Sequence, residues 1–68
     1  MECNIQRESD VWRIRLINEV RTSDYSSVEK TMNDVLEQGA EKVIVDLECV
    51  DFLASSIIGV LLETSAQL

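Results

Sequence analysis

The chain has 68 residues, 46% of them apolar, and it contains neither proline nor histidine. A chain of this length forms at most one domain, and its composition is that of a folded protein rather than of a disordered segment. Its 13 acidic residues outnumber its 6 basic residues, for a net charge of −7, which argues against a nucleic-acid partner because phosphate binding needs clustered Lys and Arg.

The N-terminal part predicts a β-hairpin. Residues 2–8 alternate weakly around Cys3 and Ile5, and a turn is expected at residues 8–10. Trp12, Ile14 and Leu16 then alternate with arginines, which is typical of a strand with one buried face and one basic, solvated face.

A helix is predicted over residues 25–38, after a polar connection over residues 18–24. Ser23 or Asp24 can cap its first turn, and Gly39 follows where a left-handed terminator is expected. One apolar stripe runs along this helix at positions i, i+4, i+7 and i+8, formed by Val28, Met32, Val35 and Leu36.

A third strand is predicted over residues 42–47. Three consecutive apolar residues, Val43 to Val45, favour a central strand that is covered on both faces. The second strand, the helix and this strand would form a right-handed parallel crossover. A short link is expected over residues 49–54.

A second helix is predicted from Ser55 onward. Its apolar residues cover well over a third of its circumference, so one face can pack on the sheet while the rest needs another cover. The sequence therefore predicts a partner for this helix, self-association through it, or the front portion of a longer domain.

The two cysteines, Cys3 and Cys49, stand far apart, and no histidine accompanies them. This excludes the usual zinc ligand sets and favours reduced thiols, which indicates the cytoplasm. The polar N-terminus is not a signal peptide, and the longest apolar run is too short to cross a bilayer.

The junction before the second helix holds the residues of chemical interest. Ser55 at the N-cap would accept hydrogen bonds from first-turn amides, which alone would explain a serine there. An enzyme is a weak alternative in which Asp46, Asp51 and Ser55 converge at the end of the third strand, because a serine nucleophile without histidine needs an unusual base.

The order of elements and the line from Val43 to Gly59 resemble the STAS domain, the fold of bacterial anti-sigma factor antagonists and of the cytoplasmic domains of sulphate transporters. Residues 43–47 match the family's apolar strand ending in Asp-Leu, and Asp51-Phe52 matches its approach to the loop. Ser55 falls on the family's phosphorylated serine, Ser56 on the residue after it, and Gly59 on its second glycine.

The resemblance implies a small α/β fold, a mixed sheet of β-β-α-β-α order with helices packed on one face. Residues 1–68 would form a single domain that lacks the C-terminal strands and helices of the family. The resemblance also implies phosphorylation at Ser55, with Ser56 as second candidate, and a partner-binding set with no metal or cofactor: Asp51, Phe52, Ala54, Ser55, Ser56, Ile57, Gly59, Asn18 and Arg21.

Two functions follow from the resemblance. In the first, the chain is a bacterial cytoplasmic regulator, not an enzyme, that binds an anti-sigma factor acting as a serine kinase and is switched by phosphorylation at Ser55. In the second, it is a STAS scaffold without a phosphorylation cycle in a transporter-associated or signalling assembly. Ala54 and Ile57, which replace the family's Asp and first Gly, favour the second.

Overall fold

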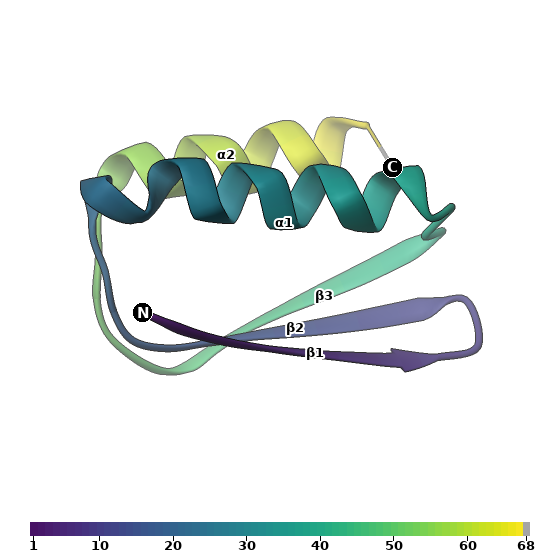
Figure 1. The fold of residues 1–68 in the computed structure, drawn as a ribbon, viewed down its shortest axis with the longest axis horizontal. Helices are drawn as coiled ribbons and strands as arrows, with labels where there is room; N and C mark the ends of the chain where they lie inside the picture. Colours follow the sequence, from purple (N-terminus) through teal and green to yellow (C-terminus); the bar gives the residue numbers. More distant parts are fainter. Residues whose placement is uncertain (68) are drawn as a thin grey trace.

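A three-stranded mixed sheet carries both helices on one face in the computed structural model, which describes residues 1–67 (Figure 1). This architecture confirms the predicted α/β class and the order of elements. The elements are β1 (Glu2–Glu8), β2 (Val11–Val20), a 3-10 turn at Thr22–Asp24, α1 (Tyr25–Glu37), β3 (Lys42–Leu53) and α2 (Ser55–Ala66).

The first two strands form the predicted antiparallel hairpin. Glu8 pairs with Val11, so the loop has only two residues, Ser9 and Asp10. Ser9 has a φ of 58°, the left-handed conformation that tight hairpin loops need. The Arg7 Nε donates to the Ser9 carbonyl at 3.2 Å, and its guanidinium lies over the Trp12 ring at 5.2 Å.

Helix α1 ends one residue before its predicted limit, and Gly39 terminates it as expected. Gly39 has a φ of +82°. Its amide donates to the Leu36 carbonyl at 3.0 Å, and the Ala40 amide donates to the Val35 carbonyl at 3.4 Å, the two bonds of a Schellman motif. The Asp24 carboxylate does not cap α1 but accepts from the Arg21 amide at 2.9 Å.

The prediction that residues 42–47 form a central strand is wrong for the described part of the chain. The sheet order is β1-β2-β3, so β2 is central, and β3 pairs only with β2, in parallel. Val43 and Val45 pack half-buried against the core, whereas Ile44 pairs with Arg13 on the uncovered face. A run of apolar residues therefore does not by itself place a strand inside a sheet.

Strand β3 is longer than predicted, because the expected link over residues 49–54 is strand as far as Leu53. Its register with β2 shifts twice, first between the Arg15–Asp46 and Ile17–Cys49 pairs and again before Phe52. Two extra residues on β3 are accommodated as bulges, which interrupt the alternation and made this stretch resemble a loop.

Asp46 stabilises the first bulge. Its Oδ1 accepts from the Glu48 amide at 3.0 Å, and its Oδ2 lies 3.2 Å from the Nε of Arg15. The Glu48 amide, together with the Arg15 guanidinium and the charge of Arg13, holds the pKa of Asp46 below its ordinary value. Each of these contacts favours the ionised carboxylate.

Asp46→Asn is expected to reduce the acid sensitivity of the fold. Because folding lowers the pKa of Asp46, its stabilising contribution is present above about pH 4 and is lost as the pH falls through the folded pKa. Urea unfolding followed by circular dichroism, from about pH 7 to about pH 2, measures this loss. Asp34→Asn, on exposed α1, controls for the removed charge; equal acid slopes in Asp46→Asn and the unmodified chain would contradict the prediction.

The core lies between the helices and the central strand. Strand β2 alone buries four apolar side chains, those of Trp12, Ile14, Leu16 and Val20. Helix α1 adds the predicted Val28, Met32 and Val35, and Ala54 with the α2 residues Ile57 and Val60 completes the cluster. The two thiols are free and exposed, at Cys3 and Cys49.

Candidate functional site

The candidate site lies where β2 and β3 end side by side. Because these strands are parallel, their carboxyl ends reach the same edge of the sheet. The Ala54 amide donates to the Val20 carbonyl at 2.9 Å, which fixes the start of α2 against the end of β2. The two regions that the sequence assigned to partner contact, residues 18–21 and 51–59, are therefore neighbours, with Asn18 paired to Val50.

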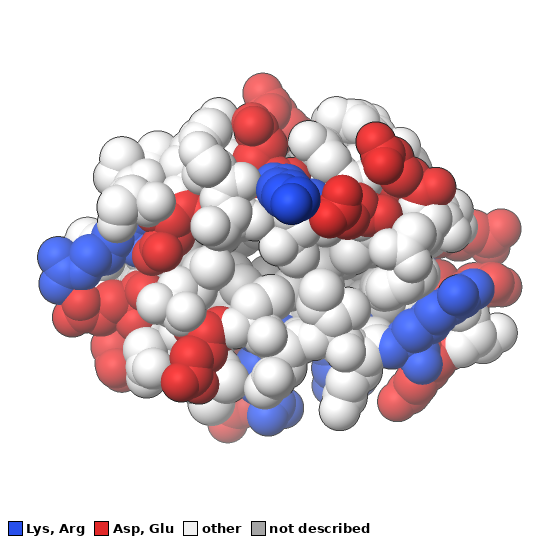
Figure 2. Space-filling model, in the orientation of Figure 1, with Lys and Arg blue, Asp and Glu red and all other residues white. Residues whose placement is uncertain are grey.

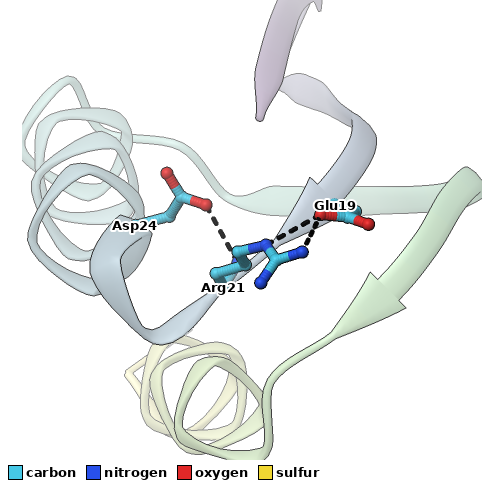
Figure 3. A network of polar contacts seen from close by, with 3 residues as sticks. All are labelled: Glu19, Arg21 and Asp24. Carbon is cyan, nitrogen blue, oxygen red and sulfur yellow. Dashed lines mark hydrogen bonds and ion pairs between the residues drawn. The ribbon is translucent and has the colours of Figure 1, made fainter.

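Arg21 contacts residues of both strand ends, Glu19 of β2 and Phe52 of β3; Figure 3 shows its contacts with Glu19 and Asp24. Its guanidinium forms an ion pair with Glu19, with the Nε 2.7 Å from Oε2, and lies 5.9 Å from the centre of the Phe52 ring. A cation–π contact at an exposed position contributes about 0.5–1 kcal/mol. Phe52 remains 53% exposed, so this contact orients the ring without covering it.

Ser55 is not the N-cap of α2, contrary to the cap prediction. Ala54 occupies that position with extended backbone angles, and no side chain caps the helix. Ser55 is the first helical residue, and its side chain is exposed. Asp51 is also exposed, and its carboxylate makes no ion pair within residues 1–67.

The residues around Ser55 differ sharply in access to solvent. The hydroxyl oxygen of Ser56 is buried and has no hydrogen-bond partner among the described residues. Ala54 is buried and Ile57 is fully buried in the core. The side chains of Ala54, Ser56 and Ile57 therefore pack inside the protein. Within residues 54–57, only Ser55 presents a hydroxyl that a second protein could reach.

The exposed face of α2 begins at Ser55. Ile58, Gly59 and Leu62 follow it at i+3, i+4 and i+7, the spacing of one helix face, and all four are exposed. Ile58 is 44% and Leu62 66% exposed, which agrees with the expectation that part of this helix lacks a cover. We call Ser55, Ile58, Gly59 and Leu62 the α2 outer stripe. The sequence analysis did not name Ile58 and Leu62 as site residues, although their helical spacing from Ser55 could have identified them.

No contact within the described chain explains why position 59 is a glycine. A Cβ added there would meet nothing within 4 Å, although glycine inside a helix costs about 1 kcal/mol relative to alanine. The backbone at this point of the stripe is therefore open to close approach from outside.

Asp46, Asp51 and Ser55 do not converge, contrary to the catalytic alternative. Asp46 lies in the middle of β3, seven residues before the strand ends at Leu53, which places it roughly 20 Å from that end. Residues 1–67 contain no cluster of three or more His, Cys, Asp or Glu side chains suited to a metal. A hollow of about 390 Å³ is on the uncovered face of the sheet, away from Ser55, and is lined by Asn4, Ile5, Gln6, Arg13 and Arg15.

The surface is acidic and its charges are mixed. Figure 2 shows acidic groups spread over the viewed face, with Lys and Arg side chains between them. The viewed face therefore shows no continuous basic stripe of the kind that nucleic-acid binding requires. Within the part of the chain that the structure describes, neither helix has the length and apolar character needed to cross a membrane.

Comparisons with known proteins agree with this architecture. A family model described as the STAS domain matches residues 2–68. The solved structure of the anti-sigma factor antagonist SpoIIAA in its unphosphorylated form superposes with a TM-score of 0.84 at 22% identity, covering 98% of this chain and 63% of that one. The Bacillus cell fate determinant SpoIIAA in the phosphorylated form gives a TM-score of 0.83 at 22% identity, covering 98% and 62%.

The chain thus spans less than two thirds of the length of these two structures. No curated protein matches its sequence.

Proposed function

Since the chain belongs to the STAS domain family, we propose that it is a regulatory binding module of the anti-sigma factor antagonist type. In this proposal, the unphosphorylated chain binds an anti-sigma factor that is also a serine kinase, in the bacterial cytoplasm, and phosphorylation of Ser55 ends the binding. The α2 outer stripe carries the proposal, because it places an exposed hydroxyl at the head of an exposed apolar surface.

The stripe suits a protein partner. Ile58 and Leu62 offer apolar area whose burial would favour association, and Gly59 lets a partner's backbone approach closely. Phe52 adds an exposed aromatic ring next to the start of the stripe, oriented by Arg21. Asn18 and Asp51, both exposed, extend the proposed contact area beyond the helix.

Phosphorylation of Ser55 would change this surface at one point. A phosphate adds a charge of about −1.5 to −2 and sits favourably at the positive end of the helix dipole. The modified chain therefore stays folded. A partner that covers the stripe would have to remove water from this charge, which opposes binding.

The kinase assay tests the proposal directly. The chain is incubated with ATP and the anti-sigma factor kinases of its own organism, and the modified residue is identified by mass spectrometry. We expect phosphate on Ser55 and not on Ser56, whose hydroxyl is buried. Ser55→Ala should abolish the modification, whereas Ser56→Ala should leave it unchanged.

A cognate antagonist of each kinase serves as positive control for activity. Modification only at other residues, or none by an active kinase, would contradict the proposal. The alternative is a STAS scaffold without a phosphorylation cycle. It is favoured by Ala54 and Ile57, which replace the family's Asp and first Gly and are both buried. It predicts partner binding that does not depend on charge at Ser55.

A further inference from the structure

Arg21 stands next to the serine that the proposed function phosphorylates. The Val20 carbonyl accepts from the Ala54 amide at 2.9 Å, and Arg21 and Ser55 directly follow this bonded pair. Bond lengths therefore keep the Cα atoms of Arg21 and Ser55 within roughly 10 Å of each other. Both side chains are exposed, so the guanidinium can turn toward Ser55 without disturbing the core.

Weak contacts hold the Arg21 guanidinium in the unmodified chain. Its Nε and one terminal nitrogen both bond to a single oxygen of Glu19, Oε2, and the two side chains are 62% and 49% exposed. Exposed ion pairs are weak because water and salt screen them. The contact with the Phe52 ring, at 5.9 Å, is exposed as well, so the guanidinium is available to a stronger acceptor.

The sequence offers no other cation for this place. Arg21 is the only basic residue of the two segments that meet at this end of the sheet, residues 16–29 and 43–66. The backbone of Arg21 is held separately, because its amide donates to the Asp24 carboxylate at 2.9 Å. The side chain can therefore change partners while the backbone keeps its position.

We propose that phosphorylated Ser55 draws the Arg21 guanidinium away from Glu19 and Phe52. This inference rests on the proposed function, in which the γ-phosphoryl group of ATP passes to the Ser55 oxygen, the hydroxyl proton leaves and ADP is released. The phosphate carries a charge of about −1.5 to −2 on three oxygens. It can accept two parallel hydrogen bonds from the planar guanidinium, a stronger arrangement than two bonds to one carboxylate oxygen.

The rearrangement gives phosphorylation a second effect on the contact area. Glu19 loses its cation, and the face of the Phe52 ring loses the group that orients it. Phosphorylation then alters the surface of β2 and β3 as well as the head of the α2 outer stripe. Arg21 is thus a positioning residue of the switch.

Phosphorus NMR of the chain with phosphoserine incorporated at position 55 during synthesis tests the contact, and it needs no kinase. The second pKa of the phosphate should be lower in this chain than in its Arg21→Gln form by about 0.5 or more, because a nearby cation favours the dianion. The neighbouring acids, Glu19, Asp24 and Asp51, are present in both forms, so the difference reports Arg21.

Two variants separate a direct contact from a general charge effect. Arg21→Lys keeps the charge but not the planar fork, and it should restore only part of the lower phosphate pKa. Arg7→Gln removes the same charge at the hairpin loop and should leave the phosphate pKa unchanged, because distant exposed charges are screened. Circular dichroism checks that each variant is folded.

The ring of Phe52 provides a second measurement. It is the only phenylalanine of the chain, so its aromatic NMR signals are identified without ambiguity. They should move when phosphoserine replaces Ser55 in the otherwise unmodified chain, and move much less in Arg21→Gln, where no guanidinium leaves the ring.

The inference and the proposed function fail separately. The same phosphate pKa with and without the Arg21 guanidinium, or equal movement of the Phe52 signals in both forms, would overturn the inference and leave the phosphorylation switch standing. Failure of an active kinase to modify Ser55 would contradict the proposed function, whatever Arg21 does.

Discussion

Ile14→Ala is expected to lower the free energy of unfolding by about 3 kcal/mol, the middle of the range for large-to-small changes in a core. Ile14 is fully buried on the central strand, so the cavity can collapse only partly. A domain of this size has a total stability of roughly 3–10 kcal/mol. The substitution therefore removes a large share of it, and urea unfolding followed by circular dichroism measures the loss.

Ile5→Ala provides a matched control. Ile5 is the direct cross-strand partner of Ile14 on β1, but it is 48% exposed. The same chemical change on the neighbouring strand should cost less than about 1 kcal/mol, because little apolar area returns to water. Equal losses in the two variants would mean that the helices do not cover the sheet as described.

If the proposed anti-sigma factor kinase is the partner, Ser55→Asp is expected to weaken binding to it by about 30-fold or more, because a charge buried in an interface without water or a counter-charge costs about 2 kcal/mol or more. The position is exposed and heads the α2 outer stripe, so the variant should fold normally. Ser55→Ala should bind like the unmodified chain. Isothermal titration calorimetry with the kinase measures both affinities.

Ser65→Asp adds the same charge to an exposed position near the other end of α2. It should leave the affinity within about twofold, because a charge outside the contact area is screened by solvent and salt. Full binding by Ser55→Asp would favour the scaffold function over the phosphorylation switch.

Local sequence patterns predicted the first half of the fold well. The hairpin follows from the alternation of Trp12, Ile14 and Leu16, and α1 follows from one apolar stripe and the terminating Gly39. These signals arise from neighbours along the chain. They need no knowledge of distant partners, which explains why β1 and α1 lie within one residue of their predicted limits.

The errors concern β3 and the start of α2, where distant contacts decide the structure. Residues 49–53 are strand because β2 extends to Val20 and supplies pairing partners, with Asn18 at a φ of 71° absorbing part of the irregularity. Acidic residues at positions 48 and 51 interrupt the apolar pattern, so the local sequence does not predict this pairing. Ala54 replaces Ser55 as N-cap because its amide bonds to Val20.

The sequence named the residues of the candidate site, which stay a prediction, but it did not predict how they are arranged. The serine pair and the acidic approach marked the junction, and the family resemblance singled out Ser55. Burial separated the members of the set: Ser56 and Ile57 turn inward while Ser55 and Gly59 turn outward. The contact between Arg21 and Phe52 joins residues 31 positions apart, and no local pattern predicts it.

The central position of β2 also determines the order in which the sheet assembles. Its partner β1 is reached through a two-residue loop, and hairpins of this kind form in about 1–10 μs. Its other partner is distant, since Trp12 pairs with Val43 only after α1 has been traversed. Closing that longer loop costs more chain entropy, so we expect docking of β3 and α2 onto a formed hairpin to be the slow step. The candidate site, built from the ends of β2 and β3, would then be completed last.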